Sequence, residues 1–196
     1  MALSDNVLTT FVDICAESLE AEDRQLHAAF QAYSPQRMYA DRHHGIWNLL
    51  EGHKLHTVFR ALLEKGFPVE VIWEGTRPGG GRGDFILRDE QAVVVGAIEA
   101  KDLMDLGCIG RLRPVLDDIT KMNRAWPGPE VRKFCLLFWH ASSEKEMQRA
   151  ILEFEQPPLH FHDEWQRTFP TRRYLEVDRC QQDGIFCITL LEVTNP

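Results

Sequence analysis

Residues 83–101 read Gly-Asp-Phe-Ile-Leu-Arg-Asp-Glu-Gln-Ala-Val-Val-Val-Gly-Ala-Ile-Glu-Ala-Lys. Two apolar runs flank the polar segment Asp89-Glu90-Gln91, which predicts two antiparallel strands joined by a turn. Asp84 opens the first run, and Glu99 and Lys101 close the second. Residues two positions apart on a strand share a face, and the turn brings Asp84 back to within a few residues of Glu99. The stretch therefore predicts two acids and an amine at one end of an apolar sheet.

The rest of the chain alternates between helical and strand patterns. Apolar residues at spacings of three and four predict helices, and short apolar runs predict strands. The predicted helices are 7–33, 45–65, 112–126 and one that runs from Ser142 or Ser143 to Phe154; the predicted strands are 69–73, 84–87, 92–100, 134–139 and 185–193. No element is predicted for the aromatic-rich segment 161–174. This order is typical of an α/β protein with a mixed β-sheet flanked by helices.

The length and composition suit a single globular unit. The chain has 196 residues, of which 44% are hydrophobic and 27% charged. We expect residues 1–44 to form an additional N-terminal helical extension and residues 45–196 the main domain, within one compact unit. There is no apolar run of 18 residues and no export-signal pattern, so we expect a cytoplasmic protein without a membrane span. Three of the five cysteines lie within apolar patterns, which predicts reduced core residues: Cys15, Cys135 and Cys187.

The net charge of −8, from 22 basic and 30 acidic residues, is the reverse of the usual nucleic-acid footprint. Broad electrostatic capture of nucleic acid is therefore not indicated. The middle of the chain differs, because residues 71–140 hold ten basic and ten acidic residues. A local positive rim beside the predicted hairpin is compatible with this distribution.

Two interpretations explain the polar residues at the end of the hairpin. Two carboxylates held against apolar strands repel one another, and each costs several kcal/mol to desolvate. A divalent cation, together with Lys101, would offset that cost. In the other interpretation the strand simply ends in solvent, where Glu99 and Lys101 form an exposed pair that contributes little.

The spacing of these residues resembles a known family. Asp84, an interval of 14 residues and then Glu99-x-Lys101 on an apolar strand resemble the PD-(D/E)xK superfamily of restriction-endonuclease-like proteins. The resemblance covers about residues 45–140, and Gly83 stands where the motif's name has Pro. It implies a restriction-endonuclease-like fold and a metal-dependent nuclease that hydrolyses phosphodiester bonds, with DNA as the expected substrate. Asp84, Glu99 and the backbone carbonyl of Ala100 would then hold Mg²⁺ or Mn²⁺, and Lys101 would orient the attacking water or stabilise charge on the phosphate.

The same family often adds an acid from the helix before the first strand. Glu51 is the best match, because it lies in line with Leu55, Val58 and Leu62 and should project toward the sheet. We therefore count Glu51 among the expected metal ligands. Glu64 is the alternative, but its place at the end of the helix predicts a solvated side chain.

Four basic residues are candidates for binding the nucleic-acid backbone. Arg77 and Arg82 flank a glycine-rich loop, and Lys121 and Arg124 lie on the helix after the hairpin. The sequence Asp118-x-x-Lys121 is similar to an Asp-x-x-Lys found on that helix in some members of the family. A surface ion pair of Lys121 with a neighbouring aspartate explains the same spacing.

Two other kinds of protein also fit the sequence. The first is a non-catalytic module of the same fold, an interaction or immunity-type protein that binds a protein partner, and the acidic net charge favours it. The second is a zinc-structured protein that uses His53 and His56, although no cysteine pair accompanies these histidines. The sequence leaves the oligomeric state open, a homodimer included.

Overall fold

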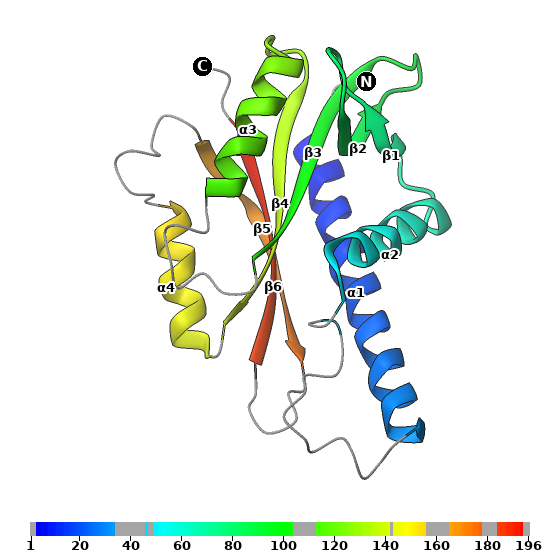
Figure 1. The fold of residues 1–196 in the computed structure, drawn as a ribbon, viewed down its shortest axis with the longest axis vertical. Helices are drawn as coiled ribbons and strands as arrows, with labels where there is room; N and C mark the ends of the chain where they lie inside the picture. Colours follow the sequence, from blue (N-terminus) through cyan, green and yellow to red (C-terminus); the bar gives the residue numbers. More distant parts are fainter. Residues whose placement is uncertain are drawn as a thin grey trace.

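The computed structural model describes residues 3–33, 46, 49–103, 113–141, 143–155, 165–177 and 184–193. Its elements, in chain order, are α1 (Asp5–Tyr33), α2 (Glu51–Glu64), β1 (Glu70–Thr76), β2 (Arg82–Arg88), β3 (Val94–Leu103), α3 (Arg113–Ala125), β4 (Arg132–Ala141), α4 (Glu144–Glu155), β5 (Trp165–Val177) and β6 (Gly184–Val193) (Figure 1). The predicted helix starts at 45 and 112, and the alternative cap Ser142, lie outside the described residues. Helix α2 itself begins at Glu51.

The six strands form one mixed sheet in the order β1-β2-β3-β4-β6-β5. Strands β3 and β4 run parallel, and the other neighbouring pairs are antiparallel. A parallel pair requires a crossover, which α3 supplies here. The fold is therefore an α/β fold with a mixed sheet flanked by helices, as the order of predicted elements indicates.

Helices cover both faces of the sheet. Helices α1 and α2 lie on one face, and α3 and α4 lie on the other (Figure 1). Strand β4 shows the consequence, because Phe134, Leu136 and Phe138 pack toward α1 and α2 while Cys135 and Leu137 pack on the side of α3. Burial on both faces explains why this strand reads as a continuous apolar run.

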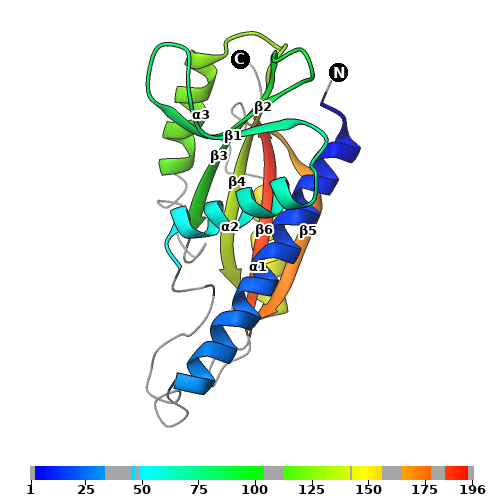
Figure 2. The same cartoon turned by 90° about the vertical axis from the view of Figure 1, so that its right-hand side faces the viewer.

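Helix α1 packs into the hydrophobic core on one face of the sheet. Its inner face is fully buried, and the ring of Phe11 packs edge-on against Phe67 and Phe85. Figure 2 shows α1 and α2 together in front of the strands, with α2 crossing them. The N-terminal helix thus shares one hydrophobic cluster with the sheet. Within the described residues, no helix combines the length and apolar character that a membrane span requires.

Strand β5 has no counterpart among the predicted elements. It is an edge strand of 13 residues that pairs with β6. Pro170 lies inside it, within the register shift between Thr168 and Arg172. Proline removes a backbone donor and is tolerated on an edge strand or at an irregularity. A proline within a run of residues argues against a strand, so the sequence pattern did not predict β5.

The hairpin of β2 and β3 has the predicted turn but a longer second strand. The Asp89 carboxylate accepts hydrogen bonds from the backbone N–H groups of Gln91 and Val93, so the turn extends to Val93 and β3 begins at Val94. Strand β3 then continues to Leu103, because β4 pairs with it to that residue. The prediction that Glu99 and Lys101 close the strand is therefore wrong: both lie inside β3.

Candidate functional site

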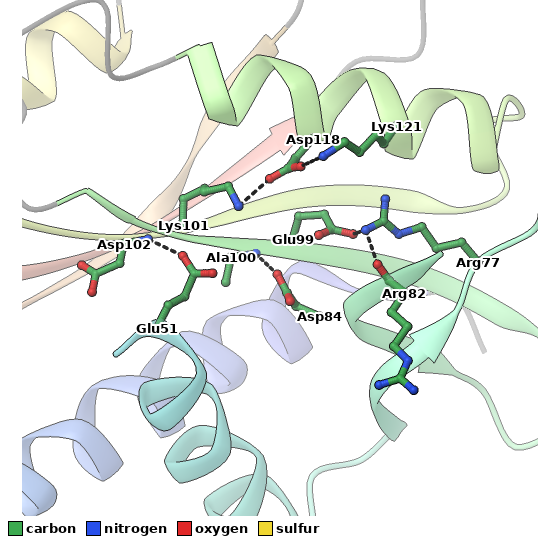
Figure 3. A network of polar contacts seen from close by, with 10 residues as sticks. All are labelled: Glu51, Arg77, Arg82, Asp84, Glu99, Ala100, Lys101, Asp102, Asp118 and Lys121. Carbon is green, nitrogen blue, oxygen red and sulfur yellow. Dashed lines mark hydrogen bonds and ion pairs between the residues drawn. The ribbon is translucent and has the colours of Figure 1, made fainter. Parts of the chain in front are cut away.

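The candidate site lies where β2 separates from β3. The last paired residues of this hairpin are Phe85 and Ile98, while β4 stays paired with the other edge of β3 as far as Leu103. The edge of β3 that β2 leaves open is filled by acidic side chains. Asp84 accepts a hydrogen bond of 2.7 Å from the N–H of Ala100. Glu51 accepts one of 2.7 Å from the N–H of Asp102 (Figure 3).

Glu51 reaches this edge from the first turn of α2. The apolar stripe of the helix, with Leu55, Val58 and Leu62 buried, turns Glu51 toward the sheet as its periodicity predicts. Burial raises the pKa of Glu51, the hydrogen bond from Asp102 opposes that rise, and the negative charge of Asp84 adds to it. The Glu51 carboxyl group therefore lies within the electric field of Asp84.

Glu99 is a buried acid, with a residue exposure of 5%. Its Oε1 atom lies 2.9 Å from the guanidinium of Arg77. Burial raises the pKa of Glu99 to about 8, and the negative charge of Asp84 adds to the rise although Arg77 opposes it. Burial and the nearby negative charges therefore outweigh the positive charges of Arg77 and Lys101, and the Glu99 carboxyl is hard to ionise in its present surroundings.

Gly83, which precedes Asp84 in β2, lies close to the ion pair of Glu99 and Arg77. A Cβ atom at this position would lie 3.2 Å from Oε1 of Glu99 and 3.5 Å from Nε of Arg77. A proline here would therefore crowd the ion pair. Because glycine has no Cβ atom, it leaves room for the contact between Arg77 and Glu99.

Lys101 projects from β3 toward α3. Its Nζ lies 2.7 Å from Oδ2 of Asp118, and Lys121 lies 2.6 Å from the other oxygen of the same carboxylate. Burial lowers the pKa of Lys101, but the hydrogen bond and the charge of Asp118 outweigh burial and leave the pKa raised. The amine is therefore a fixed positive charge at neutral pH.

Asp118 was considered in the sequence as part of an Asp-x-x-Lys pattern or of a surface pair with Lys121, but not as a partner of Lys101. Its side chain is 6% exposed, and it joins Lys101 to Lys121. The signal was present in the sequence, because Asp118 shares the buried stripe of α3 with Val115 and Met122. An acid on such a stripe requires a buried partner.

The two faces of β3 divide the site. Side chains alternate along a strand, so Glu99 and Lys101 share the face that α3 covers, while Asp102 points toward α2 (Figure 3). On the α2 side, Asp102 forms an ion pair with Lys54, whose side chain is 1% exposed. Asp84 and Glu51 approach the open edge between these faces. The structure therefore brings Glu51, Asp84, Glu99 and Lys101 to one segment of β3.

The predicted nucleic-acid contacts are spread more widely. Arg77 is held on Glu99 within the site. Arg82 is exposed and pairs with Glu74 at 2.6 Å, Lys121 is half exposed on Asp118, and Arg124 is exposed in the last turn of α3. The ion pairs of Arg77, Arg82 and Lys121 therefore involve three different acids.

The remaining candidates lie away from the site. Glu64 is exposed near Arg60, in line with the expectation of a solvated side chain. His53 contacts Glu22 on α1, whereas the ring of His56 packs against Trp73, so these two histidines have different partners. The cysteines on β4, β6 and α1 are buried thiols, as predicted; Cys108 and Cys180 lie outside the described residues.

The chemistry of the acids suits a hard cation. Carboxylate oxygens are the donors that Mg²⁺ and Mn²⁺ prefer. Over the ranges that the structure describes, no three histidine, cysteine, aspartate or glutamate side chains already converge around a metal position. Backbone N–H groups hold Asp84 and Glu51, and Arg77 holds Glu99. These contacts are the ones that a cation would replace.

No protein-family model, curated protein or solved structure matches this chain.

Proposed function

We propose that this protein is a metal-dependent nuclease of restriction-endonuclease-like fold that hydrolyses phosphodiester bonds, with DNA as its substrate. The observation that supports this most is the buried carboxyl of Glu99, whose pKa of about 8 reflects burial beside Asp84. Lys101 lies two residues further along the same face of β3. A buried carboxyl that is hard to ionise, placed beside a second acid and an ammonium group, fits a site for a cation and a phosphate.

The order of elements is compatible with this fold. The hairpin of β2 and β3 leads into a central strand that is followed by α3 and a parallel neighbour, β4. The acids lie where the hairpin opens, with Glu51 supplied by the helix before β1. This arrangement agrees with the resemblance of Gly83-Asp84 and Glu99-x-Lys101 to the PD-(D/E)xK motif.

The residues that would hold the metal are Asp84, Glu99 and the carbonyl of Ala100, with Glu51 as a further ligand. The N–H and C=O of one residue in a strand point to the same edge, so the Ala100 carbonyl belongs to the edge that Asp84 occupies. When bound, Mg²⁺ or Mn²⁺ would lower the pKa of a bound water and offset negative charge in the transition state. The acids would exchange their present hydrogen bonds for the cation.

Lys101 has a separate role. The contact with Asp118 keeps the pKa of Lys101 raised. Lys101 therefore holds its proton and would not act as a general base. A fixed ammonium beside the metal would bind a phosphate oxygen and orient the attacking water. Asp118 would act as a positioning residue, since it contacts the amine and not the reacting atoms.

Cleavage assays test the proposal. Labelled plasmid, linear and single-stranded DNA should be cut in the presence of Mn²⁺, and Glu99→Gln, Asp84→Asn and Lys101→Met should each reduce the rate by about 10²–10³-fold or more. Glu90→Gln is the matched control, because Glu90 is an exposed acid at the hairpin turn. Equal rates in Glu99→Gln and in the control would reject the assigned roles.

A second candidate is a non-catalytic module that binds a protein partner. Its support is the net charge of −8 and the internal contacts that already occupy Glu51, Asp84 and Glu99. Such a module would take up no divalent cation through these acids. Cation uptake therefore separates the two candidates.

A further inference from the structure

We propose that Arg77 occupies the place of the divalent cation on Glu99 and is displaced when the cation binds, an inference that rests on the proposed function. Its guanidinium lies 2.9 Å from Oε1 of Glu99, and the side chain is 12% exposed. In this proposal Arg77 alternates between a position on Glu99 and a position on the substrate side of the site.

The hydrogen bonds of Arg77 in its position on Glu99 are incomplete. One guanidinium nitrogen contacts both Glu99 and the carbonyl oxygen of Arg82. Its Nε atom is buried and has no hydrogen-bond partner among the described residues. A buried N–H without an acceptor is unfavourable, so the bound arginine does not use its full capacity for hydrogen bonds. Release into water would satisfy that group.

The loop that carries Arg77 allows such a release. The turn is closed at its base by hydrogen bonds from the N–H of Arg77 to the carbonyl of Gly81 and from the N–H of Gly80 to the carbonyl of Arg77. Gly79, Gly80 and Gly81 have φ angles of 81°, 99° and 83°, and a Cβ on any of them would meet nothing within 4 Å. The loop therefore projects into open space. Arg77 can swing outward while the sheet stays intact.

Charge makes the exchange necessary. Among the residues that the structure describes, Lys101 is the other cation whose charge acts on Glu99, and Asp118 already holds it. A divalent cation on Glu99 would bring two positive charges next to the guanidinium, and like charges at contact distance repel. The freed guanidinium would join the exposed Arg82 at the base of the same loop, and a guanidinium fork suits a phosphate oxygen pair. Cation loading would thus deliver a phosphate-binding group.

Nitrogen-15 NMR of arginine side chains tests this exchange. In wild type, the buried Nε–H of Arg77 should give a slowly exchanging signal, assigned by its loss in Arg77→Lys. Addition of Mg²⁺ should shift this signal or abolish it through exchange with water. Arg132 is the internal control: this β4 residue is held at 2.7 Å by Glu192 of the neighbouring strand β6, and its signal should not move.

A second variant, Glu99→Gln, separates displacement of Arg77 from Glu99 from any other effect of Mg²⁺ on the Arg77 signal. In Glu99→Gln the Arg77 signal should already have the position or exchange rate of the Mg²⁺-loaded wild type, and Mg²⁺ should leave it unchanged. Calorimetry on the same samples reports whether Mg²⁺ binds. Binding that depends on Asp84 and Glu99 while the Arg77 signal stays unchanged would overturn the exchange and leave the proposed function standing. Absence of Mg²⁺ binding by wild type would overturn both.

Discussion

Glu99 is the residue at which the energetics of the site can be read most directly. Its carboxyl is buried beside Asp84, and its pKa is about 8 against an ordinary value of 4.5. Between these two pH values the folded protein binds a proton that the unfolded chain releases. The site therefore opposes folding as the pH rises, a cost that a bound cation would remove.

This gives a prediction for stability against pH. The free energy of unfolding should fall between pH 5 and pH 8, because the folded state binds more protons there; the contribution of Glu99 is at most about 1.4 kcal/mol per pH unit. Glu99→Gln should flatten that dependence relative to wild type. Urea denaturation at pH 5.5 and pH 8 measures both slopes. Equal slopes in the two proteins would contradict the raised pKa.

Asp118 gives a second prediction at this scale. In Asp118→Asn, Lys101 loses the carboxylate that holds it, so the cleavage rate should fall by about 10–100-fold, the usual effect of a supporting residue. Lys121→Met is the matched control, because it removes the exposed partner of Asp118 and keeps the contact with Lys101. If both variants lose the same activity, Asp118 acts through Lys121 and not through Lys101.

Among the elements, β3 joins the site to both helical layers. Glu51 and Lys54 come from the first turn of α2 and contact Asp102 of β3, by its N–H and its carboxylate respectively. Lys54 is buried and its Nζ lies 5.4 Å from the centre of the Phe186 ring. The ion pair therefore fixes the start of α2 against the strand, and with it the position of Glu51.

Breaking this pair should be costly. Lys54→Met leaves the Asp102 carboxylate without its buried partner and should lower the free energy of unfolding by about 3–5 kcal/mol. The double variant Lys54→Met, Asp102→Asn should lose less, because the unpaired charge is gone. Denaturant unfolding of the three proteins measures the difference. A double variant as unstable as Lys54→Met would show that packing, and not charge, holds α2 in place.

The sequence predicted the hairpin because its determinants are local: Asp89 caps its own turn, and two apolar runs flank it. The end of β3 depends on β4, more than 30 residues away in the chain, so no local pattern marks it. Strand β5 was missed because Pro170 and charged residues interrupt its pattern. The contact of Arg77 with Glu99 depends on the path of a glycine-rich loop, which spacing does not encode.

For the molecule as a whole, α1 extends the core on which the hairpin rests. Phe11 packs on Phe85, which directly follows Asp84 in β2. Periodicity predicted this helix, but its place on the sheet arises from long-range packing. Helix α1, which begins at Asp5, therefore packs against the strand that carries Asp84.

Truncation of this contact should affect the entire fold. Phe11→Ala removes a fully buried ring and should lower the free energy of unfolding by about 3–5 kcal/mol. Thr10→Ala, at an exposed position of the same helix, should change it by about 0.5 kcal/mol or less. Thermal or urea unfolding measures both. A small effect of Phe11→Ala would mean that α1 is an appended piece.

Uptake of Mn²⁺ by the purified protein, followed by titration calorimetry at pH 8, tests the central claim most directly. Wild type and Glu90→Gln should bind the cation alike, whereas Asp84→Asn and Glu99→Gln should each weaken binding by about tenfold or more, about 1.4 kcal/mol. Wild-type protein that takes up no Mn²⁺, or an Asp84→Asn variant that binds it as wild type does, would contradict a cation site at the open edge of β3.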